Sequence, residues 1–155
     1  MSAETRAAIV AEARSWLRTP YHHMGRVKGV GVDCAQLPAM VYAACGLIDL
    51  PPLNYYPNDW HMHRSAELYL AAVTDRAVEI ATAPLPGDFV LWRFGRCFSH
   101  GAIILDWPLV AHAWIGEGVV LEDADASTRL SQIGEAGPEK GRPRPRKLFT
   151  LKEWA

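Results

Sequence analysis

The chain has 155 residues, half of them hydrophobic, and its 16 basic and 17 acidic residues leave a net charge of −1. This length and composition are typical of one domain that buries a sizeable core. Because the charges nearly cancel, they give no reason to expect a nucleic-acid partner or a polyanionic substrate. The one basic run, residues 142–147, alternates with prolines and predicts a solvated, extended arm that leads into a last strand.

The first residues carry no recognisable targeting signal. Residues 1–13 mix Glu4, Arg6 and Glu12 with alanines and lack the continuous apolar stretch of a secretory signal or a membrane span. We therefore expect synthesis in the cytoplasm and no membrane-spanning segment. Three cysteines, an odd number at irregular spacing, argue against a disulfide framework and leave at least one thiol to explain.

Two helices and a glycine-rich loop are predicted in the first third of the chain. Residues 4–17 carry apolar side chains at helical spacing, and Thr19-Pro20 ends this first helix. Residues 21–32 form a loop with three glycines, but they lack the Gly-Lys-Ser/Thr ending of a phosphate-binding loop. The second helix is predicted over residues 34–48, with Asp33 as its N-cap and Gly46 as its terminator.

The rest of the chain changes from loop and helix to strands. Residues 49–59 contain three prolines around two tyrosines and predict an aromatic loop that could wall a substrate groove, followed by a helix near residues 61–73. Strands are predicted over residues 89–94, 100–105, 110–115, 119–122 and 148–151. Helices first and an antiparallel sheet afterwards define the α+β fold class.

Cys34 stands at the predicted start of the second helix. A thiol there feels the positive end of the helix dipole and the free backbone N–H groups, and both favour the thiolate. Cys34 is therefore the candidate nucleophile, and a small buried structural residue is the alternative interpretation. Cys45 lies late in the same helix, where the dipole has the wrong sign, and Cys97 lies in a turn with no visible activating group.

Two histidines on neighbouring predicted strands complete the candidate site. A nucleophilic cysteine needs an imidazole within hydrogen-bond reach, and that imidazole needs a partner on its other nitrogen. If the strands around His100 and His112 form a hairpin whose turn is centred on Asp106, the two rings lie opposite each other on one face. His100 is then the base, and His112 orients it.

Two zinc sites are alternative hypotheses for residues of these types. The first set consists of Cys34, Cys97, His100 and His112. The second set consists of Asp59, His61 and His63. In neither set is the spacing a metal-binding signature, so we expect no metal ion.

Taken in order along the chain, the motifs resemble those of the NlpC/P60 family of cell-wall cysteine peptidases. The family pattern is an opening helix, a Thr-Pro-Tyr turn, a glycine loop, Asp-Cys, Pro-Gly-Asp and Ser-His. The corresponding residues here are Thr19-Pro20-Tyr21, residues 29–31, Asp33-Cys34, Pro86-Gly87-Asp88 and Ser99-His100, with His112 as the third catalytic position. The match runs from about residue 7 to residue 123, which makes residues 124–155 a C-terminal extension of a single domain.

The resemblance implies a papain-like α+β fold in which N-terminal helices pack on a central antiparallel sheet. It also implies hydrolysis of an amide in the peptide stem of peptidoglycan, commonly the bond between D-glutamate and a diamino acid, without a metal or cofactor. Carried over position by position, Cys34 is the nucleophile, His100 the base and His112 the orienting residue. Tyr21 and Asp33 would line the pocket for the substrate's free amine and the developing oxyanion, and Asp33 is equally well explained as a helix cap.

Two features depart from the family pattern. Ala35-Gln36 follows the cysteine where Ser-Gly is usual, and an aromatic insertion occupies residues 51–60. Together with the small size and the lack of a recognisable signal, the insertion resembles the family members of prophages, phage tails and gene-transfer agents. This resemblance implies a virion tail or prophage-derived particle as the location and phage tail proteins as partners. The alternatives are a catalytically silent structural tail component and an acyl or amide transferase on the same fold.

Overall fold

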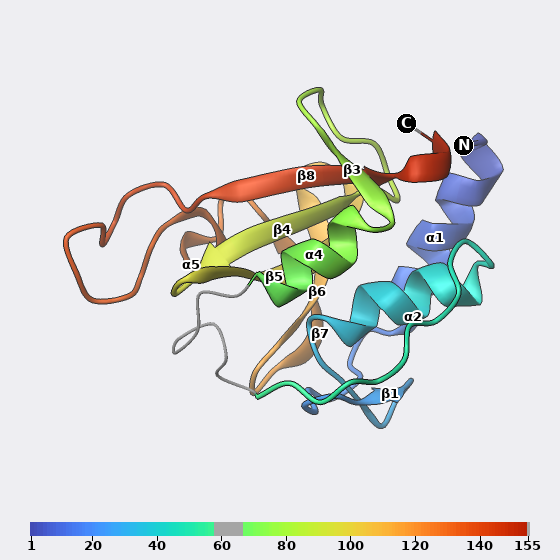
Figure 1. Ribbon diagram of the computed structural model, residues 1–155, viewed down its shortest axis with the longest axis horizontal. Helices are drawn as coiled ribbons and strands as arrows, with labels where there is room; N and C mark the ends of the chain where they lie inside the picture. Colours follow the sequence, from blue (N-terminus) through green and yellow to red (C-terminus); the bar gives the residue numbers. More distant parts are fainter. Residues whose placement is uncertain (58–66, 155) are drawn as a thin grey trace.

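The computed structural model describes residues 1–57 and 67–154, which form two sheets with helices packed against the larger one (Figure 1). Within these residues, the large sheet has six antiparallel strands in the order β3-β8-β4-β5-β6-β7, and the small sheet pairs β1 with β2. The predicted α+β class is therefore confirmed.

The helices and strands carry the labels of Figure 1. The helices are α1 (Ala3–Ser15), α2 (Gln36–Ala44), α4 (Leu68–Thr74), α5 (Thr128–Ser131) and the 3-10 helix η1 (Lys152–Trp154). The strands are β1 (Arg26–Val27), β2 (Gly31–Val32), β3 (Ala77–Ile80), β4 (Phe89–Phe94), β5 (Cys97–Asp106), β6 (Leu109–Trp114), β7 (Gly118–Asp123) and β8 (Arg146–Leu151).

The first helix, α1, confirms the prediction over residues 4–17, although it ends two residues earlier than predicted. The Ser2 hydroxyl begins the helix, because it accepts a hydrogen bond from the Thr5 backbone N–H at 3.1 Å. Ile9 and Ala13 are fully buried on the face that packs against α2 and β5. The amphipathic spacing read from the sequence therefore corresponds to the face that the helix buries.

The second helix begins later than predicted, since α2 starts at Gln36 rather than at residue 34. The Asp33 carboxylate accepts hydrogen bonds from the backbone N–H groups of Ala35 (3.0 Å) and Gln36 (2.8 Å), as predicted for its cap. Cys34 consequently lies in the turn immediately before α2 and not inside the helix.

The second helix ends at Ala44, four residues before the predicted bound of residue 48, and the predicted terminator Gly46 follows it with a φ of 70°. The helix predicted near residues 61–73 is represented by α4, and residues 58–66 lie outside the described residues. The glycine loop over residues 21–32 contains the β1–β2 hairpin. The sequence pattern does not predict this hairpin, because each of its strands has only two residues.

All five predicted strands are confirmed, and β4 has the predicted bounds. The pattern does not predict β3, which is four residues long and has only one buried residue, Ala77. β8 lies between β3 and β4, as the red arrow in Figure 1 shows. The segment expected as a C-terminal extension therefore contributes an internal strand of the large sheet.

Buried side chains form a core on each face of the large sheet. Successive strand residues alternate between the two faces, so Phe89 and Ile103 belong to the core under the helices, whereas Val90 and Ile104 belong to the other. The second core also includes Leu130 from α5. Each fully buried side chain of this size contributes about 1.5 to 3 kcal/mol to folding, so both cores stabilise the sheet.

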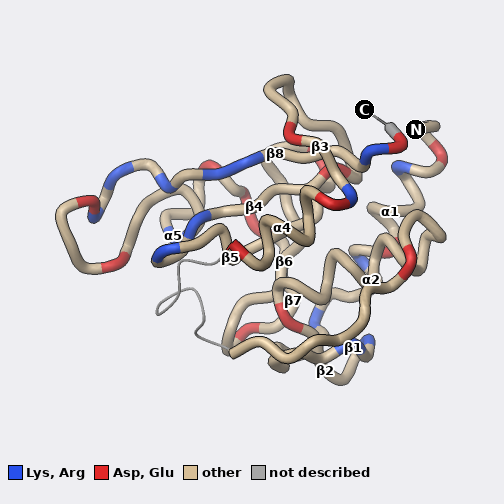
Figure 2. Tube along the Cα trace, in the orientation of Figure 1, with Lys and Arg blue, Asp and Glu red and all other residues tan. Residues whose placement is uncertain are grey.

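Basic and acidic residues are interspersed along the chain, as Figure 2 shows. Three basic residues of the C-terminal arm form ion pairs, Arg144 with Glu135, Arg146 with Asp125 and Lys147 with Glu79. These ion pairs compensate the charges of three basic side chains of the arm with carboxylates of the same chain. Among the described residues, no helix combines the length and the apolar character that crossing a membrane requires.

Candidate active site

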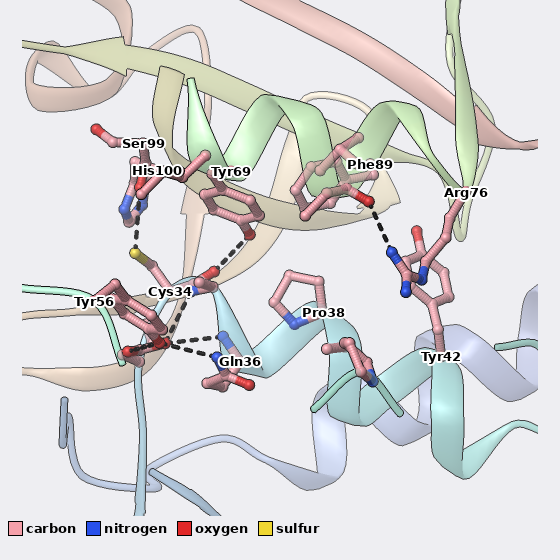
Figure 3. A pocket seen from close by; sticks show the side chains of 18 of the residues that line it. Cys34, Gln36, Pro38, Tyr42, Tyr56, Tyr69, Arg76, Phe89, Ser99 and His100 are labelled. Atoms are coloured by element: carbon pink, nitrogen blue, oxygen red, sulfur yellow. Dashed lines mark hydrogen bonds between the residues drawn. The ribbon is translucent and has the colours of Figure 1, made fainter. Parts of the chain in front are cut away.

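Cys34 lies in the wall of a pocket between the start of α2 and β5 (Figure 3). Its thiol donates a hydrogen bond to the Ser99 backbone carbonyl at 3.6 Å, and its own backbone carbonyl accepts one from the Tyr69 hydroxyl at 2.9 Å. Figure 3 shows the sulfur and the His100 ring pointing toward each other. The other two cysteines do not line this pocket.

The two predicted imidazoles are in direct contact. His100 Nε2 lies 2.8 Å from His112 Nδ1, and the ring planes meet at 90°. Both side chains are buried. The rings of Trp92, Phe94 and Trp114 surround His100, with centroid distances of 6.0, 5.5 and 5.2 Å. These aromatic walls leave the His100 ring little freedom to turn.

The hairpin that carries the two imidazoles has a different register from the predicted one. Ile103 pairs with Ala111, so His112 falls opposite Ala102 and His100 is its diagonal neighbour. The predicted turn centre is therefore wrong by one residue. The resulting shift of two residues in the pairing leaves both side chains on one face, and diagonal neighbours on a sheet are within reach of aromatic rings.

A carboxylate that the sequence analysis does not single out completes this arrangement. His112 Nε2 lies 2.8 Å from Glu122 Oε2, on β7. Arg129 contacts both oxygens of Glu122, with Nε at 3.0 Å from each. β6 and β7 pair His112 with Val120, which places Glu122 two residues further along on the same face. If the predicted strands 110–115 and 119–122 are paired as a hairpin, Glu122 can be predicted to lie near His112.

The Cys34 thiol is protonated in the resting site. Burial, followed by the negative charge of Asp33, raises the pKa of Cys34 to about 12. A hydrogen bond from the Tyr21 hydroxyl acts in the opposite direction but does not cancel this effect. Desolvation thus opposes the predicted preference for the thiolate at the helix start. Cys34 needs a base to lose its proton.

Both oxygens of the buried Asp33 carboxylate are occupied by groups of the protein itself. Oδ1 accepts the two backbone N–H groups at the start of α2. Oδ2 accepts hydrogen bonds from the Met24 backbone N–H at 2.8 Å and from the Tyr56 hydroxyl at 2.6 Å, and His23 Nδ1 lies 3.7 Å away. The helix-cap interpretation is thus realised. A substrate amine reaches this carboxylate only by displacing the Tyr56 hydroxyl, so amine binding by Asp33 stays a prediction.

Tyr21, the other residue predicted to bind substrate, lines the same pocket. Burial raises the pKa of the Tyr21 hydroxyl, and a thiolate at Cys34 and the charge of Asp33 act in the same direction. The hydroxyl therefore stays protonated and is a hydrogen-bond donor beside the sulfur.

The two departures from the family pattern, Gln36 after the cysteine and the aromatic loop, contact each other. Gln36 Nε2 donates to the Tyr56 hydroxyl at 2.9 Å, and Gln36 Oε1 accepts from Arg26 Nε at 2.7 Å. Arg26 also donates to the Pro51 carbonyl at 2.7 Å, and His23 Nε2 lies 2.7 Å from the Tyr56 carbonyl. The aromatic loop is thereby fastened over the start of α2 and walls the pocket, as predicted.

The pocket has a volume of about 780 Å³ and extends along α2. In Figure 3, Pro38 and Tyr42 lie between Cys34 at one end and Arg76 at the other. Tyr42 is eight residues after Cys34, which corresponds to a wall about 12 Å long at the rise of an α-helix. The guanidinium groups of Arg26 and Arg76 line the pocket, and within the described residues neither forms an ion pair with a carboxylate.

Gly101, next to His100, allows α4 to approach β5 closely. A Cβ atom at this position would lie 2.3 Å from the Tyr69 hydroxyl oxygen and 2.4 Å from the Phe89 ring. A larger residue would displace Tyr69, whose hydroxyl binds the Cys34 carbonyl. The lack of a side chain at Gly101 thus keeps Tyr69 in place against the Cys34 carbonyl.

The zinc hypotheses find no support in the part of the chain that the structure describes. There, no three His, Cys, Asp or Glu side chains are grouped so that they could hold a metal ion. The set that includes Cys97 is therefore not assembled. The residues of the second set, Asp59, His61 and His63, lie outside the described residues.

A thiol before a helix and a hydrogen-bonded imidazole pair on an antiparallel sheet bring a nucleophile and a base together at one pocket. Among known proteins, no family model and no curated protein matches the sequence. The chain is similar to the solved NlpC/p60 domain of the peptidoglycan hydrolase SagA, with 28% identity over 76% of this chain and 88% of that domain and a TM-score of 0.52.

A second solved structure supports the same fold. It is a protein from Staphylococcus aureus subsp. aureus Mu50, described as similar to lipoprotein of the NLP/P60 family (SAV0400), with 19% identity and a TM-score of 0.58. The match covers 93% of this chain but only 41% of the staphylococcal protein. Together the two likenesses show that the chain has the NlpC/P60 fold, as its motifs predict.

Proposed function

We propose that this protein is a cysteine endopeptidase that cleaves the peptide stem of peptidoglycan at the amide bond between D-glutamate and a diamino acid. The observation that carries the proposal is that Cys34 meets the hydrogen-bonded His100–His112 pair at one pocket. The likeness to the NlpC/p60 domain of a peptidoglycan hydrolase supports the substrate class.

The cycle begins when Cys34 transfers its proton to His100. Because His100 Nε2 contacts His112, the nitrogen that serves the sulfur is Nδ1. With the pKa of Cys34 raised by burial, the thiolate forms only as an ion pair with the imidazolium. The thiolate then attacks the amide carbonyl. Two donors beside the sulfur, the Cys34 backbone N–H and the Tyr21 hydroxyl, stabilise the oxyanion that develops.

The remaining steps return every group to its starting state. His100 donates its proton to the leaving amine, the C–N bond breaks, and the acyl group stays on Cys34 as a thioester. Water then attacks the thioester carbonyl and gives a proton back to His100. The acid product leaves, and the sulfur recovers its proton from the imidazole.

Two carboxylates, Asp33 and Asp75, line the pocket together with two guanidinium groups that suit a carboxylate of the substrate. Arg26 and Arg76 line the pocket without a carboxylate partner in the described part of the chain. A stem peptide in which D-glutamate is linked through its side chain keeps a free α-carboxylate that can pair with such a guanidinium group. The wall of about 12 Å along α2 matches about three to four extended residues, which is the size of a stem peptide.

We further propose that the enzyme acts from a phage tail or a prophage-derived particle, in contact with tail proteins. This part of the proposal is supported by the motifs and the aromatic insertion, which resemble those of the family members of prophages and phage tails. A second candidate function is acyl or amide transfer. The aromatic and aliphatic walls of the pocket, among them Pro38, Tyr42 and Phe89, favour this candidate because they suit an aliphatic acyl group.

The decisive experiment measures new amino groups and product masses after incubation of the protein with defined stem peptides, with and without EDTA. We expect cleavage by the wild type, none by Cys34→Ala, and full cleavage by Cys45→Ala, a matched cysteine outside the pocket lining. EDTA should change nothing. Amidation of the D-glutamate α-carboxylate should slow cleavage about tenfold, which corresponds to one lost ion pair of about 1.4 kcal/mol.

Three outcomes would redirect the proposal. Cleavage by Cys34→Ala would refute the cysteine mechanism. An amide product formed with an added amine would favour the transferase. Failure of the wild type on every stem peptide would favour the structural tail component.

A further inference from the structure

Glu122 is the outer member of a hydrogen-bonded chain that leads away from the pocket. His100 Nε2 lies 2.8 Å from His112 Nδ1, and His112 Nε2 lies 2.8 Å from Glu122 Oε2. His112, between the other two, has no exposed surface, so water does not take the place of either neighbour. The protonation of His112 is therefore decided by His100 on one side and Glu122 on the other.

The carboxylate fixes the direction of every hydrogen bond in this chain. An ionised carboxylate only accepts hydrogen bonds, whereas a neutral imidazole donates from one nitrogen and accepts at the other. Glu122 therefore requires the His112 proton on Nε2, which makes His112 Nδ1 an acceptor. His100 must then donate from Nε2, and its Nδ1 can take the proton of Cys34. Without the carboxylate, the other tautomer of His112 would be allowed.

Glu122 is itself held ionised and in place. Arg129 Nε contacts both carboxylate oxygens at 3.0 Å, and the Ser127 hydroxyl donates to Oε1. Burial raises the pKa of Glu122, but the bonds from Arg129, Ser127 and His112 outweigh it and lower that pKa below its ordinary value. Arg129 also pairs with Glu117 at 2.8 Å, which anchors it from the solvent side.

Among the described residues, few charged groups face the imidazole pair. They are Cys34 from the start of α2, Glu122 from β7, Arg129 from α5 and Glu117 beyond Arg129. β4 and β6 present aromatic rings to His100. Glu122 is thus the carboxylate in direct contact with the pair, and its charge favours an imidazolium there.

We propose that Glu122 is a positioning residue of the peptidase, which fixes the tautomer of His112 and stabilises the imidazolium that forms when Cys34 loses its proton. The inference rests on the proposed function, because that reaction gives the imidazolium its role.

Two measurements test the inference without a peptide substrate. The first is ¹⁵N NMR of the imidazoles, for which we expect the wild-type His112 proton on Nε2 and a mixture of tautomers in Glu122→Ala. The second is the pH dependence of alkylation at Cys34 by iodoacetamide, followed by peptide mass. In Glu122→Ala the reactivity at neutral pH should fall about tenfold, because less imidazolium supports the thiolate.

Kinetics on stem peptides give a third measurement. Glu122→Gln should lower kcat about 10- to 100-fold with little change in KM, the usual scale for a partner that orients a functional histidine. The basic limb of its pH profile should move to lower pH, and Glu122→Asp should restore part of the activity. The matched control is Glu79→Gln. Glu79 lies on β3, at the opposite edge of the sheet, and its carboxylate pairs with Lys147. It should leave all three readouts unchanged.

A wild-type His112 protonated on Nδ1 would overturn the inference, and so would Glu122→Gln with the tautomer, alkylation profile and kcat of the wild type. If Glu122→Ala does not fold, the tautomer of His112 in the wild type and the measurements on Glu122→Gln still test the inference. The expected tautomer and alkylation profile in a wild type that cleaves no stem peptide would support the role of Glu122 in holding the ring and contradict the proposed function alone.

Discussion

The two sides of the pocket are built in different ways. The imidazole side takes His100, His112 and Glu122 from three neighbouring strands, whose regular pairing brings the side chains into line. The thiol side takes Cys34 from a turn, and one buried carboxylate, Asp33, binds the glycine loop, the aromatic loop and the helix start together. Many backbone hydrogen bonds hold the first side together, whereas on the second side one side chain, Asp33, contacts all three segments. Substitutions on the thiol side should therefore be the more damaging.

Replacing Asp33 with alanine should have the largest effect of the predicted substitutions. The change removes a helix cap and leaves the Met24 N–H and the Tyr56 hydroxyl without their acceptor. We expect a loss of about 3 to 4 kcal/mol in the free energy of unfolding and no stem cleavage. Denaturant unfolding measures the first quantity. Asp106→Ala, at an exposed site at the end of β5, is the control and should cost less than about 0.5 kcal/mol.

An equal, small loss in Asp33→Ala and Asp106→Ala would show that the loops hold without the carboxylate. In that case the two sides of the pocket would not differ in the way described.

The next largest effect is expected where the two sides touch, at Gly101. Alanine there would place a methyl group within 2.4 Å of Tyr69 and Phe89, so α4 must move away from β5. We expect a loss of about 2 to 3 kcal/mol of stability, together with reduced kcat because Tyr69 leaves the Cys34 carbonyl. Thermal unfolding and stem cleavage measure the two effects. Gly134→Ala, where an added Cβ meets no atom within 4 Å, should be close to neutral; a similar loss there would refute the steric explanation.

The smallest effect is expected in the outer layer of the imidazole side, where Arg144 binds Glu135 at 2.9 Å. Burial raises the pKa of Glu135, but the bonds from Arg144 outweigh it and bring that pKa to about 2. The folded-state pKa lies below the unfolded one, so the pair stabilises fully above about pH 4.5 and loses its effect as the pH falls toward 2.

Glu135→Gln should therefore be less stable than the wild type by about 0.5 to 1 kcal/mol at pH 7 and indistinguishable from it near pH 2. Thermal unfolding at pH 7, 4 and 2.5 checks this. A constant difference at all three values would mean that shape, and not charge, is what Glu135 contributes.

Local pattern was enough to predict most of the fold. The apolar spacing of α1, the Asp33 cap and the bounds of β4 all depend on neighbours within a few residues, and the structure has them where the sequence places them. The candidate site was reached in the same way, since Cys34 and His100 each stand at the edge of a strongly patterned element. The structure brings these residues together with His112, and their catalytic roles stay predictions.

Contacts between distant segments could not be read from pattern. Glu122 meets His112 only because β6 and β7 pair in one register, and Gln36 meets Tyr56 only because the aromatic loop returns over the helix start. The desolvation of Cys34 could not be predicted from the sequence for a related reason. A helix start is a local feature, whereas the desolvation that opposes it comes from groups folded around the thiol.

The place of β8 in the sheet affects how a nascent chain matures. β8 follows all the other strands in the sequence, yet it lies between β3 and β4. Until β8 has left the ribosome, β4 is an exposed edge of the sheet and β3 has no partner among the described strands. The pocket wall also lacks Phe149 and Leu151 until then. Exposed edges pair readily with other chains. A nascent chain without β8 thus presents an unpaired sheet edge to other chains, and its pocket closes only when β8 is in place.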